Sequence, residues 1–386
     1  MSKTNLRADF KLGYLGAGQL ARMSALQAFR YGIQIGLYTD RSGDEPVDFM
    51  TPYSTTGSFD DTEELTAFAS EYDILTLENE FLSSLVLREV QEQSGTPIYP
   101  SPSTFAKIEN KLIEKQTFEK AGIPVTPYAL VGTVEEIQKF GNKHGWPFVL
   151  KSSKGGYDGY GNETVNNPEE AEAAYRALGG FKGHKIIAEA FIDFSKELAV
   201  QVARNETGSV VYPCCETIQE NHINTAVISP APIDPEIRKE AQKMALSVTE
   251  TLDARGLFAY EFFLTEDGNL LLNESAPRPH NSGHYTIEGC ITSQFENHVR
   301  AVMGLPLGST EMRKPVVVMM NLLGKYKRKA KVNHFRKSMA QVDGHLHVYG
   351  KLQSKIGRKM GHYTLLGDDL EAVYAQAKEY AEQIQL

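Results

Sequence analysis

Cysteine and long apolar runs are both scarce in this chain of 386 residues. The cysteines are Cys214, Cys215 and Cys290, and none of them belongs to a C-x-x-C pair. The sequence therefore predicts neither a disulfide framework nor a cysteine zinc site, and it fits a reducing compartment. No apolar run approaches the roughly 20 residues of a membrane helix, and residues 1–10 lack the apolar region of a signal peptide. We expect a cytoplasmic protein without a membrane partner.

Net positive charge is also lacking, since the formal net charge is −9. This acidity argues against general nucleic-acid binding. The segment from Lys325 to Lys359 is an exception, with eleven Lys or Arg residues and Asp343 as its single acid. It predicts either a solvated basic face or a local pocket for an anion such as a phosphate ester.

A parallel α/β sheet is predicted for the first hundred residues, where strand-like and helical patterns alternate. Apolar runs at 11–16, 33–39 and 73–77 have the composition of strands, and 19–31 has the pattern of a helix between the first two. Strands that alternate with helices in this way favour a parallel sheet. A Pro-rich stretch at 97–102 is the predicted boundary of this domain.

The rest of the chain mixes helices with strands and hairpins, and its length leaves room for two or three domains. The predicted helices are 109–121, 236–252 and 369–385, and the predicted strands are 147–152, 185–192, 257–264 and 270–273.

A glycine motif follows the first predicted strand. The segment from Gly16 to Ala21 matches the dinucleotide-binding pattern G-x-G-x-x-A, and Asp40 lies at about the distance of a ribose-binding acid. The same glycines also fit another phosphate site at a helix N-terminus, or a tight strand-to-helix turn. The motif alone leaves a nicotinamide enzyme and these alternatives open.

A second glycine-rich loop follows the predicted strand that carries Lys151. The segment from Gly155 to Gly161 holds four glycines in seven residues. Backbone N–H groups of such a loop can lie against phosphates, and the loop can move as a lid. Because a hairpin turn needs fewer glycines, we favour a phosphate-binding loop.

Two acidic residues are predicted to face each other on a β-hairpin. Asp267-Gly268 separates the last two predicted strands and is a favoured pair for a two-residue type I′ turn. That turn places Glu261 opposite Glu274, and opposed carboxylates destabilise a strand pair unless something compensates. A divalent cation, with Asn273 as a further oxygen ligand, is the predicted compensation. Two solvated acids are the alternative.

Directly after this hairpin comes a polar loop, 277–284, with the sequence Pro-Arg-Pro-His-Asn-Ser-Gly-His. It is dense in hydrogen-bonding groups and is held by two prolines. Such a loop beside a metal site indicates substrate binding.

Three motifs together resemble those of the N5-carboxyaminoimidazole ribonucleotide synthetases, which are ATP-grasp enzymes of purine biosynthesis. The motifs are Asn-Glu-x-Ala-Pro-Arg-Pro-His-Asn-Ser-Gly-His at 273–284, the loop 155–161, and His-x-His-x-Tyr-Gly-Lys at 345–351 with Arg-Lys-Met-Gly-His at 358–362. The similarity runs from about 11 to 364, nearly the whole chain.

The resemblance implies an α/β fold of three domains in a homodimer. These are an N-terminal Rossmann-like parallel-sheet domain at 1–105, an ATP-grasp domain at 106–310 with a mobile lid around 122–192, and a small C-terminal domain at 311–386. The implied activity is ATP-dependent carboxylation of 5-aminoimidazole ribonucleotide with bicarbonate, through carboxyphosphate and with Mg²⁺.

The resemblance also implies roles for individual residues. Catalytic roles fall to Lys151, Tyr157, Asp158, Arg278 and His280. ATP contacts fall to Lys111, Lys151, Gly155, Gly156, Tyr157, Asp158, Gly159, Tyr160, Gly161, Glu189, Ala190, Phe191, Ile192, Glu197, His222, Asn273 and Glu274. Magnesium ligands are Glu261 and Glu274. Contacts with the ribonucleotide fall to Gln19, Glu78, Tyr157, His280, Asn281, Ser282, Lys351, Arg358 and Lys359.

The chain departs from the family pattern at several positions. Lys111 stands where Arg is usual, Tyr160 stands where Arg or Lys is usual, and His222 replaces a histidine expected near Gln219. Two alternatives stay open: an ATP-grasp ligase with a different acceptor, and a nucleotide-binding protein that is not an enzyme.

Overall fold

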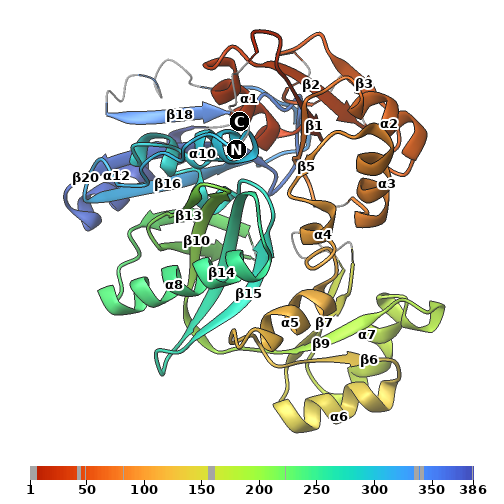
Figure 1. Ribbon diagram of the computed structural model, residues 1–386. Coiled ribbons are helices and arrows are strands. Elements are labelled where there is room, and N and C mark those ends of the chain that lie inside the picture. Colours follow the sequence, from red (N-terminus) through yellow and green to blue (C-terminus); the bar gives the residue numbers. More distant parts are fainter. Residues whose placement is uncertain are drawn as a thin grey trace. The chain divides into compact units, whose positions relative to one another are not determined.

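The computed structural model describes residues 7–386 except 41–44, 48, 81, 155–160, 222, 334–338, 340–342 and 385 (Figure 1). The chain forms two compact units. Unit 1 comprises Met1–Phe105, Leu198–Tyr260 and Ser275–Leu386, and unit 2 comprises Ala106–Glu197 and Glu261–Glu274. Each unit is described by itself.

Unit 1 begins with a five-stranded sheet in the order β3-β2-β1-β4-β5, and all its strand pairs are parallel. Its strands are β1 (Lys11–Leu15), β2 (Gln34–Thr39), β3 (Ser54–Thr56), β4 (Ile74–Leu77) and β5 (Ile98–Tyr99). The helices between them are α1 (Gln19–Phe29), α2 (Thr62–Ala69), α3 (Ser84–Ser94) and α4 (Pro102–Phe105). The predicted parallel α/β sheet is confirmed, with strand ends within one residue of the prediction.

Local sequence explains where these helices begin and end. Asp61 precedes α2 and accepts a hydrogen bond from the backbone N of Glu64 at 3.0 Å, which satisfies a free donor of the first turn. Gly95 ends α3 with a left-handed φ of 74°, a conformation that glycine adopts without a Cβ penalty. Buried Leu12, Tyr14 and other strand residues pack against alanines of α1 to form the core.

A second sheet in unit 1 is antiparallel where its register is defined, and it includes the strand order β10-β12-β13-β16-β20-β18, with β11 beside β10. Its strands are β10 (Phe194–Asn205), β11 (Gly208–Val211), β12 (Cys215–Glu220), β13 (Ile223–Ser229), β16 (Val316–Leu323), β18 (Gly344–Val348) and β20 (Lys359–Gly367). Helices α8 (Pro235–Thr251), α9 (Thr286–Gly289), α10 (Gln294–Val302) and α12 (Leu370–Gln383) accompany it. Short strands β17 (Arg328–Lys329) and β19 (Gln353–Ser354) pair separately, and α12 packs on β16 and β20.

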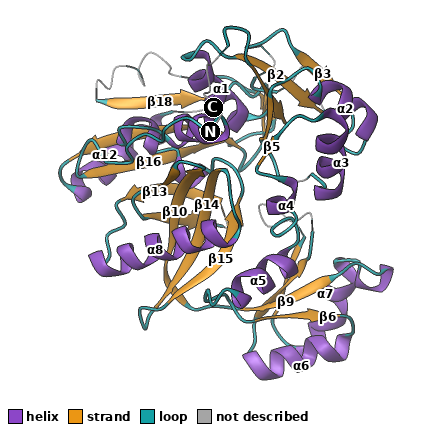
Figure 2. Ribbon diagram, in the orientation of Figure 1, coloured by secondary structure: helices purple, strands orange, loops and turns teal. Residues whose placement is uncertain are grey.

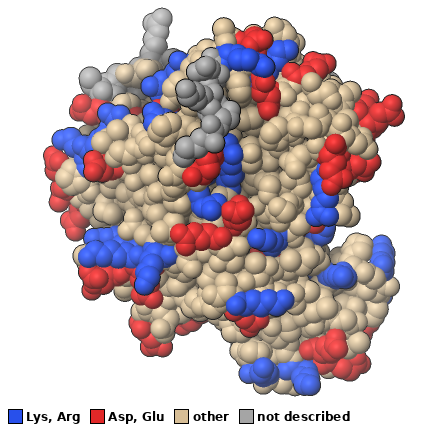
Figure 3. Space-filling model, viewed as in Figure 1, with Lys and Arg blue, Asp and Glu red and all other residues tan. Residues whose placement is uncertain are grey.

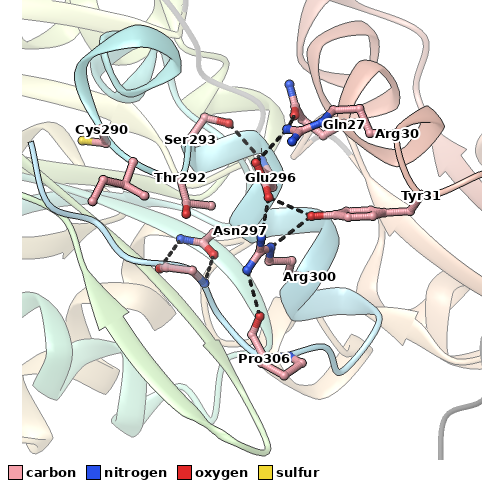
Figure 4. Close-up of polar contacts among 12 residues, drawn as sticks. Gln27, Arg30, Tyr31, Cys290, Thr292, Ser293, Glu296, Asn297, Arg300 and Pro306 are labelled. Atoms are coloured by element: carbon pink, nitrogen blue, oxygen red, sulfur yellow. Dashed lines mark hydrogen bonds and ion pairs between the residues drawn. The ribbon is translucent and has the colours of Figure 1, made fainter. Parts of the chain in front are cut away.

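A buried carboxylate connects α10 to the end of α1 (Figure 4). Glu296 Oε2 lies 2.9 Å from Arg30 Nη1, and its Oε1 accepts hydrogen bonds from Tyr31 Oη at 2.7 Å and from Arg300 Nη2 at 2.5 Å. Burial alone would raise the pKa of Glu296, but the hydrogen bonds from Tyr31 and Arg300 outweigh it and lower that pKa. The carboxylate therefore stays charged and holds the helix against the N-terminal sheet of the same unit.

Unit 2 contains a four-stranded antiparallel sheet in the order β6-β9-β7-β8 (Figure 2). The strands are β6 (Tyr128–Val131), β7 (Phe148–Ser152), β8 (Asn162–Val165) and β9 (Ile186–Ala190), and the α-helices are α5 (Lys111–Lys120), α6 (Val134–His144) and α7 (Ala171–Ala177). Ile137, Phe140, Phe148 and Leu150 are among its buried core residues. Unit 2 also contains the turn end of the hairpin between β14 (Gly256–Thr265) and β15 (Leu270–Ala276).

Surface charge and helix composition can be described for the part of the chain that the structure covers. On the face shown in Figure 3, the described Lys and Arg side chains lie among Asp and Glu without one continuous basic area. Within the described residues, no helix has both the length and the apolar composition needed to cross a membrane.

Candidate active site

Unit 2 holds a buried carboxylate between two lysines. Glu189 on β9 lies with its Oε2 2.9 Å from Lys151 Nζ on β7 and 3.3 Å from Lys115 Nζ on α5. Burial alone raises the pKa of Glu189, but Lys151 and Lys115 outweigh it and lower that pKa. Burial also lowers the pKa of Lys115, against the opposing effect of Glu189. Because Lys115 and Lys151 share one carboxylate within the described residues, the cluster favours a further anion nearby.

A second ion pair lies in the same unit. Lys111 Nζ on α5 donates to Glu274 Oε2 on β15 at 3.0 Å, and Glu274 raises the pKa of Lys111. The backbone N of Leu272 donates to Pro124 O at 2.8 Å, which fastens β15 to the segment after α5. The structure therefore brings together four residues predicted to contact ATP: Lys111, Lys151, Glu189 and Glu274.

Sequence reasoning missed Lys115 and Thr126 of this cluster. Lys115 Nζ donates to Thr126 Oγ1 at 2.7 Å and also lies beside Glu189. The signal was present, because Lys115 follows Lys111 by four residues and such residues share one helix face. Nothing in the local sequence, however, indicated that this face is buried.

The β14–β15 hairpin turns differently from the prediction. Gly268 N donates to Thr265 O at 2.9 Å, and Thr265 N donates to Asn269 O at 3.0 Å. Gly268 has a φ of 81°, whereas Asp267 has no positive φ, and a type I′ turn needs positive values at both. The predicted turn is therefore wrong, and Thr265 rather than Glu266 lies opposite Asn269.

This one-residue difference affects the predicted metal pair. If the pairing of Thr265 with Asn269 continues along the strands without a bulge, Asn273 rather than Glu274 would lie opposite Glu261. Glu274 keeps a half-exposed side chain, 45% accessible, and its carboxylate faces Lys111. That Glu261 and Glu274 bind magnesium stays a prediction. It now rests on their carboxylate chemistry rather than on positions directly opposite each other in the hairpin.

The predicted adenine and ribose contacts follow β9. Ala190 ends that strand, and its N donates to Pro127 O at 2.9 Å. Phe191 is 59% exposed, and Ile192 and Glu197 are partly buried. Six residues of the predicted phosphate loop, 155–160, and His222 lie outside the described residues.

Unit 1 contains a pocket of about 460 Å³ where the predicted ribonucleotide contacts Gln19, Glu78, Lys351 and Arg358 come together. The other lining residues are Gly16, Ala17, Gly18, Thr39, Asp40, Glu45, Ser58, Phe59, Asp60 and Asn79. Lys359 is not among the described lining residues, but its backbone O accepts a hydrogen bond from Lys351 Nζ at 2.8 Å.

The first glycine motif makes room for Glu78. A Cβ at Gly16, where φ is 116°, would lie 2.7 Å from Glu78 Cβ, and a Cβ at Gly18 would collide with the carboxylate. The backbone N of Leu20 donates to Glu78 Oε1 at 3.4 Å. The motif therefore serves a close approach between loop and carboxylate, and its match to a nicotinamide fingerprint does not require a dinucleotide.

Burial shifts two charged groups of this pocket, Glu78 and Lys351, toward neutrality. It raises the pKa of Glu78 to about 7, with Arg278 acting in the opposite direction. Burial and then Arg358 lower the pKa of Lys351 to about 8. Arg278 itself is held by an ion pair from its Nε to Glu80 Oε2 at 2.5 Å. The pocket thus changes charge close to neutral pH.

The polar loop after β15 is held by hydrogen bonds within the loop and by hydrogen bonds to β10 and β16. His280 Nδ1 lies 2.8 Å from Ser282 Oγ, which also accepts from Gln201 Nε2 at 2.9 Å. Asn281 and Asn321 exchange two amide hydrogen bonds of 2.8 and 2.7 Å. Ser282 is fully buried, so its described contacts stabilise the loop. Substrate contacts of His280, Asn281 and Ser282 stay predictions.

Comparison with known proteins first defines the class. The chain matches the ribonucleotide synthetase preATP-grasp domain at residues 10–109, the ATP-grasp domain at 116–295, and the phosphoribosylaminoimidazole carboxylase C-terminal domain at 317–376. It is an ATP-grasp protein with these two flanking domains.

The relatives define the family. N5-carboxyaminoimidazole ribonucleotide synthase of Bacillus subtilis is 36% identical over 367 residues, covering 95% of this chain and 94% of that protein. Phosphoribosylaminoimidazole carboxylase of Ogataea methanolica is 36% identical, covering 93% of this chain but 67% of the longer relative. The chain belongs to the N5-carboxyaminoimidazole ribonucleotide synthase family.

Solved structures agree. The Thermotoga maritima synthetase has a TM-score of 0.85 and 36% identity, with 97% of this chain and 99% of that chain covered. The Aspergillus clavatus synthase, in complex with ADP and 5-aminoimidazole ribonucleotide, has a TM-score of 0.86 and 32% identity, with 97% and 99% covered. The predicted family, α/β fold and three-part architecture are confirmed.

Proposed function

We propose that this chain uses ATP to carboxylate 5-aminoimidazole ribonucleotide with bicarbonate, which forms N5-carboxyaminoimidazole ribonucleotide in purine biosynthesis. The observation that carries the proposal is that two separate sets of cations occur in one family member. Unit 2 gathers Lys111, Lys115 and Lys151, and the unit 1 pocket gathers Lys351 and Arg358. A reaction that takes a nucleoside triphosphate and a second phosphate ester as substrates needs two such sets.

The cations of unit 2 suit the phosphates of ATP. Lys151 and Lys111 are each held by a carboxylate, so their ammonium groups are oriented before a ligand arrives. Oriented cations stabilise charge on a transferring phosphoryl group without reorganising during the reaction. Lys151 is therefore the residue to which we assign the main phosphate contact, and the segment after β9 is assigned to adenine.

Magnesium fits the carboxylates of the hairpin. Glu261 and Glu274 offer hard oxygen donors, as does the amide of Asn273, and the half-exposed Glu274 side chain is accessible to an ion. When bound, magnesium would neutralise charge on the β- and γ-phosphates. Lys111 would then exchange its partner carboxylate for phosphate oxygen.

This reaction needs little covalent catalysis by the protein. A bicarbonate oxygen attacks the γ-phosphorus of ATP, ADP leaves, and carboxyphosphate forms. Cleavage of the C–O bond of carboxyphosphate releases phosphate and carbon dioxide, which the exocyclic amine of the ribonucleotide attacks. The amine loses a proton as the carbamate forms. Arg278 and His280, together with Tyr157 and Asp158 outside the described residues, are the proposed groups around the reacting atoms.

The unit 1 pocket suits the ribonucleotide. Arg358 can hold its phosphate by a two-pronged contact, and Lys351 adds a point charge. Glu78 is an acceptor for amino hydrogens of the aminoimidazole. We also propose a homodimer, which light scattering of the purified protein would test.

An omission assay tests the function. ADP release should require both bicarbonate and 5-aminoimidazole ribonucleotide, because carboxyphosphate is consumed productively only with the acceptor. Replacing the ribonucleotide by other amines is the control. If another amine supports faster ADP release, the chain is a ligase with a different acceptor, and absence of ATP turnover would contradict an enzyme altogether.

A further inference from the structure

Unit 1 contains a cluster of two histidines and a glutamate to which the proposed carboxylation assigns no role. His347 on β18 and His362 on β20 lie directly opposite each other in the antiparallel register. Opposed side chains on one sheet face lie within contact distance. Glu288 of α9 completes the cluster, and one ligand-type atom from each of the three residues lies within 4.8 Å of the others.

The contacts within the cluster are close. His347 Nε2 lies 2.7 Å from Glu288 Oε1, and the two imidazole rings are stacked with centroids 4.4 Å apart and planes 13° apart. Tyr349 Oη lies 2.9 Å from His362 Nδ1 and fixes that ring. Three donors of the types that bind zinc are therefore already assembled, and one of them has a hydrogen-bonded support of the kind that orients metal-ligating histidines.

Two atoms of the cluster have no hydrogen-bond partner among the described residues. They are Glu288 Oε2 and His362 Nε2, and both are inaccessible to solvent. The His362 side chain is fully buried. Buried polar atoms without a partner are costly and require an explanation.

The ring of His284 lies near His362, with centroids 5.2 Å apart, but its hydrogen bonds exclude it as a metal ligand. Gln294 Oε1 accepts from His280 N, and Gln294 Nε2 donates to His280 O, which fixes the orientation of the amide. That amide nitrogen also lies 3.0 Å from His284 Nδ1, which must accept. His284 Nε2 therefore carries the proton and is not available as a ligand.

We propose that Glu288, His347 and His362 form a binding site for a divalent transition-metal ion of the zinc class. Two imidazoles and one carboxylate are a ligand set that zinc accepts, with a fourth position for water. Magnesium prefers oxygen ligands, so the site is distinct in chemistry from the hairpin carboxylates.

Metal binding requires one rearrangement. A metal lies in the plane of each imidazole that binds it, and parallel stacked rings do not share such a point. His347 is the ring that turns, because its side chain is 29% exposed and β18 is the last strand in the described order of its sheet. His362 is held by Tyr349. Binding therefore breaks the stack and replaces the hydrogen bond between His347 and Glu288.

Cobalt(II) titration of the full chain tests the proposal. The protein is first treated with a chelator, and visible absorption then reports Co²⁺ in a site containing nitrogen ligands. We expect one equivalent to bind and zinc to displace it, whereas excess magnesium does not. Losing even an outer partner of a metal ligand costs about 10- to 100-fold in affinity, so Glu288→Gln or His347→Gln should cost at least about a hundredfold.

His345→Gln is the matched control, because His345 is exposed on the same strand and outside the cluster. It should leave the affinity unchanged. His347→Gln on the partly exposed edge keeps the experiment informative if a variant at buried His362 fails to fold. If the wild type gives no cobalt band, or if Glu288→Gln and His347→Gln both bind Co²⁺ as tightly as the wild type, the proposal is overturned and the unpartnered atoms are assigned to a buried water.

Discussion

Unit 2 and unit 1 each gather charged side chains around a predicted anion site, but the charges are held in opposite ways. In unit 2, Lys151 and Lys111 are paired with carboxylates, and Glu274 raises the pKa of Lys111. In the unit 1 pocket, burial raises the pKa of Glu78 to about 7 and lowers the pKa of Lys351 to about 8. The carboxylate beside Lys111 favours its charged form, whereas burial favours the neutral forms of Glu78 and Lys351.

The difference matches what each ligand needs. ATP always carries several negative charges, so fixed cations with exchangeable carboxylate partners suit it. The ribonucleotide must be held by its phosphate while its amine becomes a nucleophile, and groups with pKa values near neutrality can accept or give a proton there. The predictions below test these two modes of holding charge, from the largest expected effect to the smallest.

Removing the buried carboxylate of unit 2 should destabilise the protein strongly. Glu189→Gln leaves Lys115 and Lys151 without their counter-charge in a site where the Glu189 side chain is 5% exposed. Breaking a buried pair on one side typically costs about 3–5 kcal/mol of unfolding free energy. Denaturant unfolding measures this, with exposed Glu163→Gln on β8 as the control. If Glu189→Gln and Glu163→Gln have the same free energy of unfolding, the carboxylate of Glu189 does not stabilise the fold.

Removing the exchangeable carboxylate should instead affect turnover. Glu274→Gln keeps the shape but removes the charge proposed to bind magnesium, so kcat should fall by roughly a hundredfold or more. The control is Glu266→Gln, which lies exposed at the turn of the same hairpin. Near-normal kcat of Glu274→Gln at saturating magnesium would remove Glu274 from the metal site.

The raised pKa of Glu78 predicts a pH-dependent gain in stability for Glu78→Gln. The pKa is about 7 in the folded chain against 4.5 for an ordinary glutamate, so the wild type loses stability as pH rises from about 4.5 through 7. At pH 8 the variant should be more stable by at most about 3 kcal/mol, and at pH 4 the two should be alike. Thermal unfolding of both proteins at pH 4 and pH 8 measures this stability difference. If the difference is the same at both pH values, the pKa of Glu78 is not raised in the folded chain.

Truncating a phosphate-binding cation should separate the two substrates. Arg358→Ala should raise KM for the ribonucleotide roughly tenfold to a hundredfold, since a charged hydrogen bond contributes about 1.5–3 kcal/mol. KM for ATP should barely change. Lys355→Ala is the control, because Lys355 is exposed and outside the described pocket lining. An unchanged ribonucleotide KM would indicate a solvated turn, and a matching rise for ATP would place Arg358 at the other ligand.

Local patterns predicted the elements well because helices and strands follow short-range periodicity. The helix predicted at 236–252 is Pro235–Thr251, and the strand predicted at 73–77 is Ile74–Leu77. The turn at Asp267-Gly268 was wrong because a glycine with positive φ also fits a wider turn, in which Asp267 keeps an ordinary conformation.

The sites were less predictable because they depend on long-range packing. The unit 1 pocket joins Gly16 to Lys351 and Arg358, which no local pattern connects. The resemblance supplied those residues individually, but it gave neither the clash that requires glycine beside Glu78 nor the pairing of His347 with His362.

Transfer of oxygen from bicarbonate to phosphate tests the central claim most directly. With ¹⁸O-labelled bicarbonate, ATP and 5-aminoimidazole ribonucleotide, attack on the γ-phosphate leaves one bicarbonate oxygen in each phosphate released. Mass spectrometry of the phosphate should therefore find one ¹⁸O per molecule formed. Phosphate carrying oxygen from water instead would show that ATP is merely hydrolysed, and it would contradict a carboxylation through carboxyphosphate.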